Sequence, residues 1–316
     1  MTNFWQKLPK PFTVLAPMEN VTDFVFREIV AENLPCPDVF FTEFTNVESL
    51  LSKGYDANIT KFKYGEKQRP IIAQIWGTNP ESFYKVAKMV QDLGFDGIDI
   101  NMGCPVAEVI KIGGGAGMIN NKDNAREVIQ AVKKGAPKLP ISVKTRIGVK
   151  SVVTEEWITF LLEQRIAAIT IHGRTAKQMS KGSADWNEIA KAVKIRDEIS
   201  PNTLIIGNGD IETYSQAIEM HEKYDVDGVM IGRGIFKNPW VFDKASTEHT
   251  SKEYIDILLK HLSLYESTRV GTRSADPMKK FYKMYVNNFP GANQLRQQLM
   301  ETKSFDEARK LLSKYN

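Results

Sequence analysis

The chain has 316 residues, of which 42% are hydrophobic and 25% are charged, and its formal net charge is +4. This composition excludes a disordered chain, and two cysteines exclude a disulfide-stapled scaffold and fit a reducing cytoplasm, where we expect the protein to act. No apolar run reaches the roughly 18 residues that a membrane-spanning helix needs. Prolines at positions 9, 11 and 17 interrupt the N-terminus, so we expect neither a membrane anchor nor a signal peptide.

Short β-rich runs recur as far as residue 232, with amphipathic segments between them. Several runs are almost continuous in valine, isoleucine and leucine, as expected for strands buried on both faces. The eight predicted strands are 12–16, 38–44, 70–76, 97–101, 141–145, 167–172, 203–208 and 228–232, and the main predicted helices are 80–94, 124–135, 154–165, 186–199 and 213–224. This alternation predicts an α/β fold, a (β/α)8 TIM barrel. A doubly wound sheet is the alternative, but its GxGxxG turn does not follow the first predicted strand.

The pattern changes after Phe242, because no further strand-like run follows. The remaining predicted helices are 254–268, 276–289 and 305–315. We therefore predict two domains, a catalytic barrel over residues 1–245 and a small all-α helical bundle over residues 246–316. The second domain holds 12 Lys and Arg against 8 Asp and Glu, whereas the first is neutral. Such a basic region is typical of a surface that contacts nucleic acid, and a solvated helix face gives the same pattern.

Polar residues cluster at the ends of the predicted strands. Barrel enzymes place their active sites at the C-terminal ends of the strands, where side chains of one phase converge. The candidates at these ends are Gln74, Asp99, Asn101, Cys104, Ser142, Lys144, Arg146 and His172. Each type of residue also occurs in ordinary structural positions, but so many together indicate a ligand site, because buried charges need partners.

Two glycine-containing turns follow the seventh and eighth predicted strands, at residues 207–210 and 232–234. Barrels commonly bind phosphate at this place, where glycine lets the backbone approach and Arg233 can hold an anion. Tight βα turns without a ligand are the alternative. The four histidines and two cysteines show no metal-ligand spacing, so we expect no metal site.

Motifs in a fixed order along nearly the whole chain identify a resemblance. They are APMENVTD (16–23), TEF (42–44), AQIWG (73–77), NMGCPV (101–106), GGGAGM (113–118), VKTRIG (143–148), HGRTAKQ (172–178), GNGDI (207–211), GVMIGRGIFKNPW (228–240), MKKFYKMYV (278–286) and FPGANQLR (289–296). With these motifs the chain resembles the dihydrouridine synthases, flavoenzymes that reduce specific uridines in tRNA. It departs from the family at Met179-Ser180 and at Phe281, which bears on RNA contacts.

The resemblance implies an FMN-binding barrel, NADPH as reductant, tRNA as partner and a helical RNA-binding domain, with no protein partner. It implies that Cys104 is the catalytic acid. The implied FMN-binding residues are Ala16, Pro17, Met18, Gln74, Lys144, His172, Asn208, Gly209, Asp210, Gly232 and Arg233. The implied substrate-binding residues are Asn101, Glu43, Arg174, Lys279, Lys280, Lys283 and Arg296, with Arg269, Arg273 and Lys177 as further RNA candidates.

The chemistry of the residues agrees with this interpretation. Reduction of the C5=C6 bond of uracil needs a hydride at C6 and a proton at C5, and a thiol with a pKa near 8.5 is largely protonated at pH 7. Lys144 near the flavin would stabilise developing negative charge. Three alternatives stay open: a dihydrouridine synthase acting on ribosomal RNA, a small-molecule FMN pyrimidine dehydrogenase such as a dihydroorotate enzyme, and a non-catalytic RNA-binding barrel. The sequence does not fix the uridine that is modified, a preference between NADPH and NADH, or the oligomeric state.

Overall fold

The computed structural model describes residues 3–268, 274–287 and 289–315. Contacts within the chain separate it into two compact units. The barrel unit comprises residues 1–24, 37–211 and 215–232, and the helical unit comprises residues 25–36, 212–214 and 233–316. The functional division at residue 245 stays a prediction; by contact alone, the helical unit begins earlier and includes two segments from the first part of the chain.

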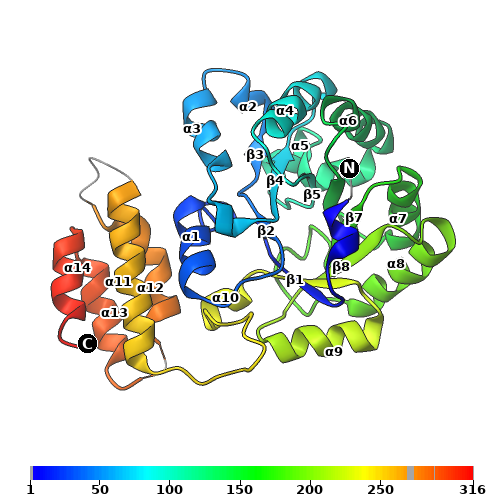
Figure 1. Ribbon diagram of the computed structural model, residues 1–316. Helices are drawn as coiled ribbons and strands as arrows, with labels where there is room; N and C mark the ends of the chain where they lie inside the picture. The colour runs from blue at the N-terminus through cyan, green and yellow to red at the C-terminus, as the bar shows by residue number, and fades with distance from the viewer. Residues whose placement is uncertain (1–2, 269–273, 288, 316) are drawn as a thin grey trace. The chain divides into compact units, whose positions relative to one another are not determined.

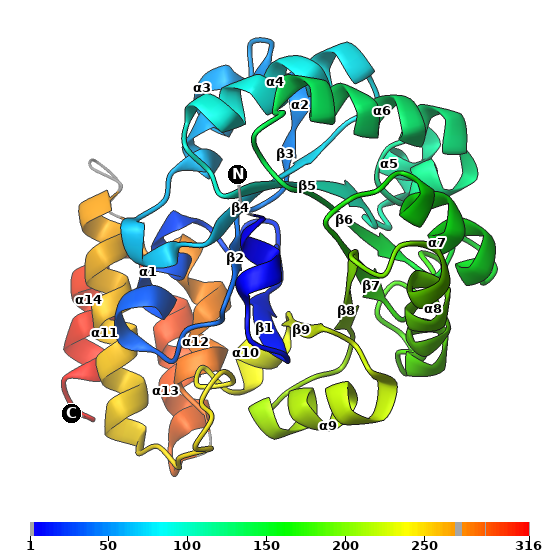
Figure 2. The same ribbon diagram turned by 45° about the vertical axis from the view of Figure 1, so that its right-hand side comes forward.

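The barrel unit is a nearly closed parallel eight-stranded barrel with helices around it, within the described part of the chain (Figures 1 and 2). Its strands are β1 (Phe12–Leu15), β2 (Phe40–Phe41), β3 (Thr45–Asn46), β4 (Ile71–Trp76), β5 (Gly97–Met102), β6 (Ile141–Arg146), β7 (Ala168–His172), β8 (Leu204–Asn208) and β9 (Gly228–Ile231). Their order is β1-β9-β8-β7-β6-β5-β4-β2. Both β2 and β3 pair with β4, one after the other along it, so these two short strands together fill one of the eight positions. The predicted (β/α)8 fold class is confirmed.

Backbone hydrogen bonds also join β1 to Val39, the residue before β2, so the ring of strands is nearly closed. Val14 and Val39 form a parallel bridge, and Leu15 N donates to Val39 O at 3.1 Å. At the N-terminal end of the strands, the short helix η1 (Phe4–Lys7) buries Trp5, whose ring centroid lies 5.7 Å from that of Phe12. Side chains therefore fill the N-terminal end of the barrel, whereas polar residues gather at the C-terminal end.

The second predicted strand, 38–44, is interrupted in the structure. Thr42 N still donates to Ile72 O at 2.9 Å, but Gln74 N donates to the Thr42 hydroxyl at 3.1 Å rather than to a main-chain carbonyl. The ladder therefore breaks between β2 and β3, and Glu43 lies in this break.

The five main helices predicted around the barrel are all present. They are α4 (Pro80–Asp92), α6 (Lys122–Gly135), α7 (Thr154–Glu163), α8 (Trp186–Ile199) and α9 (Tyr214–Tyr224). The start of α4 follows the expected chemistry, because the Asn79 side chain accepts a hydrogen bond from Ser82 N at 3.0 Å and proline occupies the first turn. Shorter helices fill the loops: α2 (Val47–Leu50), α3 (Tyr55–Ile59), η2 (Thr60–Phe62), η3 (Glu66–Gln68), α5 (Ala107–Lys111) and η4 (Gly115–Asn120).

The helical unit packs around a core of aromatic rings. Its helices are α1 (Phe24–Asn33), α10 (Gly234–Lys237), α11 (Ser251–Thr268), η5 (Asp276–Met278), α12 (Lys279–Tyr285), α13 (Ala292–Glu301) and α14 (Phe305–Leu312). Phe281 is fully buried, stacked on Phe26 with a centroid separation of 5.3 Å and near Phe236 at 6.3 Å. Among the described residues, no helix combines the length and the apolar character needed to cross a bilayer.

One predicted helix, 276–289, is shorter and divided in the structure. It forms η5 followed by α12, and the chain leaves the helix at Val286, whose φ and ψ are −104° and 81°. Arg296 Nη1 donates to Val286 O at 2.6 Å, which satisfies a carbonyl at this helix end.

Candidate active site

Parallel pairing aligns polar side chains in two layers at the C-terminal ends of neighbouring strands. In one layer, Gln74 of β4 is level with Asp99 of β5, which is level with Ser142 of β6. In the next layer, Asn101 is level with Lys144. Residues two apart on a strand share a face, so both layers project to the same side of the sheet.

Hydrogen bonds join four of these side chains into one buried polar network. Ser142 Oγ donates to Asp99 Oδ1 at 2.7 Å, and Gln74 Nε2 donates to Asp99 Oδ2 at 2.7 Å. Asn101 Nδ2 then donates to Gln74 Oε1 at 3.2 Å. Burial raises the pKa of Asp99 to about 6, and the two hydrogen bonds oppose this shift, so the carboxyl is mostly ionised at pH 7. Gln74, an expected FMN contact, has no exposed surface and uses its amide in this network.

The turn that carries Cys104 is held by hydrogen bonds on several sides. Asn101 Oδ1 accepts from Gly103 N and Cys104 N, both at 3.0 Å. Arg146 Nε donates to Gly103 O at 2.8 Å, and Ala116 N donates to Cys104 O at 3.1 Å. The half-buried thiol is therefore set on a fixed backbone rather than on a loose loop.

The surroundings of Cys104 keep its thiol protonated at neutral pH. Burial raises the pKa of the Cys104 thiol, and nearby Glu19 also raises it, whereas Arg146 and Lys144 lower it. Arg146 is itself 7% exposed, and burial lowers its pKa to about 10, so it stays charged at pH 7. A protonated thiol beside two cations is suited to give up a proton rather than to act as a resting nucleophile.

Arg146 also connects two loops at the mouth of the barrel. Besides Gly103 O, its guanidinium donates through Nη1 to Thr175 O at 3.1 Å and to Met179 O at 2.9 Å. The sequence indicated its phase on the strand but gave no role for it. Three carbonyls bound by one buried guanidinium show that Arg146 fastens the Cys104 turn to the loop after β7.

Lys144 lies next to the end of β8. Its Nζ donates to Asn208 Oδ1 at 3.2 Å, and Asn208 Nδ2 donates to Met230 O at 2.8 Å. Burial, with a smaller contribution from Arg146, lowers the pKa of Lys144 to about 8, while Asp99 opposes this shift. Burial therefore disfavours the charged form of Lys144, and an anionic ligand bound beside it would stabilise that form.

The residues expected at the phosphate end lie together at the ends of β7 and β8. His172 is level with Asn208, and its ring contacts Arg174 Nη1 at 3.1 Å. Gly209 has a φ of 139°, and an added Cβ would lie 2.4 Å from Ala184 Cβ, so a side chain does not fit there.

Arg174 does not lie on an accessible surface, as an RNA-contacting residue would. It is 2% exposed, and its guanidinium binds Asp210 Oδ2 at 2.6 Å and the Gly182 carbonyl. Asp210 Oδ2 also accepts from Ala184 N at 2.8 Å. Arg174 and Asp210 therefore fix the loop that carries Gly209, and the structure gives Arg174 no exposed surface for RNA. Lys177, by contrast, is exposed in the same loop.

The other expected flavin contacts lie where β1 and β9 end side by side. Ala16 N donates to Ile231 O at 2.9 Å, Ala16 and Pro17 are buried, and Met18 is half-buried. An added Cβ at Gly232 would lie 3.4 Å from Ala16 Cβ and 3.8 Å from Met18 Sδ, so this glycine lines the same end of the barrel unit. Arg233 is exposed and is the first residue of the third segment of the helical unit.

Glu43 is a buried carboxyl beside other acids. It is 5% exposed and accepts a hydrogen bond from Asn20 N. Burial raises the pKa of Glu43, and Asp23 and Glu19 raise it further, while Lys61 opposes them. Its role towards substrate stays a prediction.

In the helical unit, three of the predicted RNA-binding residues meet at one groove. Lys279, Lys283 and Arg296 line a space of about 910 Å³, called here the basic groove, together with Tyr282, Asn293, Gln297, Met300 and Glu301. Lys279 also pairs with Asp276 at 2.6 Å. Lys280 does not line the groove, and its ammonium lies 4.9 Å from the ring centroid of Phe281.

The two departures from the family pattern differ in their surroundings. Met179 is 53% exposed, so an RNA contact there stays open. Phe281 is fully buried in the core of the helical unit and therefore acts in packing rather than at an RNA surface. Arg269 and Arg273 lie outside the described residues.

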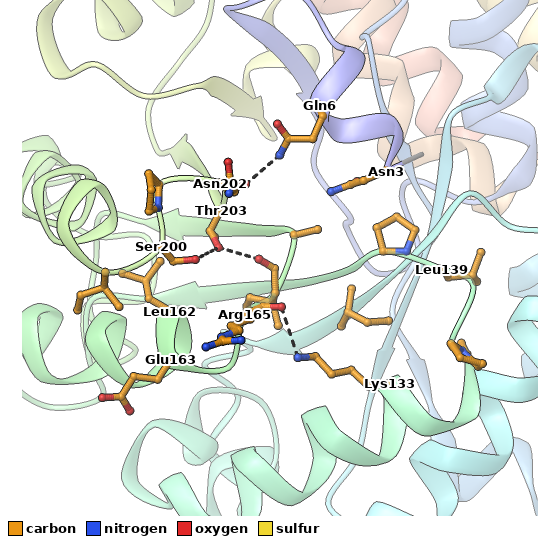
Figure 3. A pocket seen from close by; sticks show the side chains of 18 of the residues that line it. Asn3, Gln6, Lys133, Leu139, Leu162, Glu163, Arg165, Ser200, Asn202 and Thr203 are labelled. Atoms are coloured by element: carbon orange, nitrogen blue, oxygen red, sulfur yellow. Dashed lines mark hydrogen bonds between the residues drawn. The ribbon is translucent and has the colours of Figure 1, made fainter. Parts of the chain in front are cut away.

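A separate pocket of about 1360 Å³ lies at the N-terminal ends of β6, β7 and β8 (Figure 3). Three polar side chains of its lining bind within the protein: Lys133 Nζ donates to the Gln164 carbonyl, Thr203 Oγ1 to Ile166 O at 2.8 Å, and Gln6 Nε2 to Asn202 O at 2.8 Å. None of the predicted site residues lines this pocket.

The family model described as Dihydrouridine synthase (Dus) matches residues 14–315. The chain belongs to the dihydrouridine synthase family. Proteins named "Probable tRNA-dihydrouridine synthase" from Staphylococcus aureus (strain COL) and "Probable tRNA-dihydrouridine synthase 2" from Bacillus subtilis (strain 168) are each 49% identical to it. The alignments cover 99% of this chain in both cases, and 95% and 96% of the two relatives.

Two solved structures are similar to this member of the dihydrouridine synthase family in fold only. Morphinone reductase in complex with tetrahydroNAD superposes with a TM-score of 0.51 at 12% identity, over 76% of this chain and 88% of the reductase. A 2-naphthoyl-CoA reductase complex superposes with a TM-score of 0.56 at 9% identity, over 74% of this chain and 49% of that chain. Both likenesses agree with the barrel.

The glycine-rich motif of the family, GGGAGM, supports the Cys104 turn in this chain. Gly115 has a φ of 52°, and an added Cβ would lie 2.8 Å from Cys104 Cβ and 2.9 Å from Cys104 O. The sequence singled out this run but gave no reason for it. The reason is close packing against the backbone of Cys104.

Replacing Gly115 with alanine is therefore expected to lower the free energy of unfolding by about 3 kcal/mol, from an unfavourable φ and overlap with Cys104. Gly113→Ala is the matched control, because Gly113 also has a positive φ of 87° but no described residue lies within 4 Å of an added Cβ. The control should cost about 1 kcal/mol, from the backbone conformation alone. Urea unfolding measures the free energy of unfolding of both variants. Equal losses would show that the contact with Cys104 adds no cost.

Proposed function

We propose that the protein is a tRNA-dihydrouridine synthase, which uses NADPH and FMN to reduce the C5=C6 bond of a uridine in tRNA. Membership of the family and the names of its close relatives support the reaction and the substrate. The observation that carries the proposal is the environment of Cys104. Burial favours its protonated thiol, and hydrogen bonds with Asn101 of β5 and Arg146 of β6 hold its turn in place.

The residues present fit an FMN group at the C-terminal end of the barrel. Lys144 offers a cation whose charge burial disfavours, and the lack of a side chain at Gly232 leaves space beside Ala16 and Met18 at the end of β9. Ala16 to Met18, Lys144, His172, Asn208, Gly209 and Gly232 would hold it, and Asp210 and Gln74 would act through the groups that they bind. When bound, FMN supplies hydride transfer from NADPH to C6 of the uracil ring.

The residues of this chain then supply the proton and the charge. Cys104 Sγ gives its proton to C5 as the hydride reaches C6, so the product gains one hydrogen at each carbon, and the thiolate is reprotonated from water. Arg146 and Lys144 stabilise the negative charge left on sulfur. Asn101 commits Oδ1 to the Cys104 turn and one hydrogen of Nδ2 to Gln74, so its second Nδ2 hydrogen is the group that would bind the edge of the uracil.

The uridine must leave the RNA stack to reach this end of the barrel, at a cost of a few kcal/mol. Phosphate contacts at the basic groove offset this cost. The test is to incubate the purified protein with NADPH and an unmodified tRNA transcript and to measure dihydrouridine by mass spectrometry. Ribosomal RNA, free uracil and orotate are the parallel substrates. Turnover of the free bases without turnover of RNA would favour a small-molecule pyrimidine dehydrogenase, and protein that lacks flavin absorption would favour a non-catalytic RNA binder.

Neutralising the basic groove should weaken tRNA binding. The double variant Lys279→Gln, Lys283→Gln is expected to bind tRNA about tenfold more weakly at low salt, and the slope of log K against log salt should become shallower by about 1.5, since each phosphate contact contributes about 0.7 to 0.9.

The matched control is Lys260→Gln, Lys310→Gln, which makes the same charge change at exposed positions on α11 and α14. Filter-binding measurements over a salt series give the tRNA affinity and its salt dependence for both double variants. Equal effects in both variants would show that net charge, rather than the basic groove, governs binding.

A further inference from the structure

Asp99 is a buried carboxylate that the proposed reaction does not use. It has no exposed surface, yet burying a charge is costly unless partners compensate. Its two oxygens accept from Ser142 Oγ and Gln74 Nε2, both at 2.7 Å. It lies one layer below Asn101 and Lys144, so it does not itself reach the place where a ligand would bind.

The chemistry of a carboxylate dictates the direction of every hydrogen bond above it. An ionised carboxylate only accepts, so Gln74 must turn its NH2 group towards Asp99 and its oxygen towards Asn101. Asn101 must then donate through Nδ2 and present Oδ1 to the two N–H groups of Gly103 and Cys104. If the Asn101 amide were turned around, its NH2 group would face the N–H groups of Gly103 and Cys104, and these two donors would lose their acceptor.

We propose that Asp99 is a positioning residue for the catalytic acid, because it acts through Gln74 and Asn101 to fix the turn that carries Cys104. The inference rests on the proposed function only for the role of Cys104, since the chain of hydrogen bonds from Asp99 to the Cys104 turn is independent of substrate. Arg146 fastens the opposite side of this turn, so loss of Asp99 loosens one side and leaves the other in place.

The experiment measures the Cys104 thiol directly. In a Cys36→Ser background Cys104 is the sole cysteine of the chain, so its alkylation by iodoacetamide can be followed against pH without RNA or NADPH. In Asp99→Ala the turn loosens and the thiol becomes more exposed, and we expect alkylation at pH 7 to be about tenfold faster. We also expect dihydrouridine formation to fall at least tenfold, and by a larger factor than NADPH oxidation, which is measured in parallel.

The conservative variant Asp99→Asn should restore most of this loss. Its oxygen can still accept from Gln74, and its NH2 can donate to the Ser142 hydroxyl, so alkylation and turnover should stay within about threefold of the native chain. Thr170→Val is the matched control, because Thr170 is also fully buried in the barrel and its hydroxyl has no hydrogen-bond partner among the described residues. It should change none of the three rates.

Two further outcomes keep the proposal open to refutation. If Asp99→Ala does not fold, Gln74→Met cuts the same link above the carboxylate and should give the same faster alkylation. A native alkylation profile in whichever of these two variants folds would overturn the proposal. If the native chain makes no dihydrouridine but the alkylation profiles differ as stated, the proposed function fails while the role of Asp99 stands.

Discussion

Replacement of Cys104 with alanine is expected to lower dihydrouridine formation by at least about 100-fold, the usual contribution of a general acid. The hydride can still arrive at C6, but no group remains in place to deliver the proton to C5. NADPH oxidation and tRNA affinity should stay near the native values, because alanine keeps the backbone hydrogen bonds of the Cys104 turn, from Cys104 N to Asn101 Oδ1 and from Arg146 Nε to Gly103 O. Stopped-flow absorbance measures flavin reduction by NADPH and flavin reoxidation by tRNA separately, and only the second should be slowed.

Cys36→Ala is the matched control for this result. Cys36 is exposed, and its sulfur lies near backbone carbonyls in the helical unit, such as Ala31 O at 3.6 Å. The control should keep full activity. Native turnover in Cys104→Ala, or an equal loss in both variants, would remove Cys104 from the mechanism.

Replacement of Lys144 with methionine is expected to stabilise the flavin-free protein at pH 7 by up to about 3 kcal/mol. Burial lowers the pKa of Lys144 from 10.5 to about 8, and each unit corresponds to about 1.4 kcal/mol. Below pH 8 the lysine is charged in the folded and unfolded states, so the folded state bears the whole penalty. Above pH 10.5 it is neutral in both states and the penalty is gone.

The free energy of unfolding of the native chain should therefore rise between pH 8 and pH 10.5, and that of Lys144→Met should not. Lys150→Met, at an exposed position in the loop after β6, should keep the native pH dependence. Urea unfolding at several pH values measures all three proteins. A native curve in Lys144→Met would mean that the ammonium is solvated in the folded chain.

Much of the barrel could be predicted from its sequence because several of its strands are almost continuously apolar. Gly228–Ile231 is such a strand, with every residue buried, and the helices between the strands have regular start residues, such as Asn79 and Pro80 at the start of α4. The break after β2 could not be predicted, because it depends on the Thr42 hydroxyl replacing a carbonyl in the ladder. The early end of α12 is likewise accompanied by a non-local contact, because the Val286 carbonyl accepts a hydrogen bond from Arg296, ten residues further along the chain.

The candidate site followed from strand phase, which brings Asn101 and Lys144 level with each other. Phase alone does not tell an accessible side chain from a buried one. Arg174 is buried because Asp210 and the Gly182 carbonyl, from other turns, surround its guanidinium. Phe281 is a core residue because Phe26, far away in the chain, stacks on it.

Helix α1 belongs to the helical unit although it lies between the first two strands of the barrel in the chain. Its Phe26 stacks on Phe281, so residues more than 250 positions apart share one core. A recombination that exchanged only the C-terminal segment between related genes would pair one α1 with a foreign α12. A chain that acquires a new C-terminal segment therefore needs matching residues in α1. A chimera built from two of these proteins should exchange α1 together with the C-terminal segment.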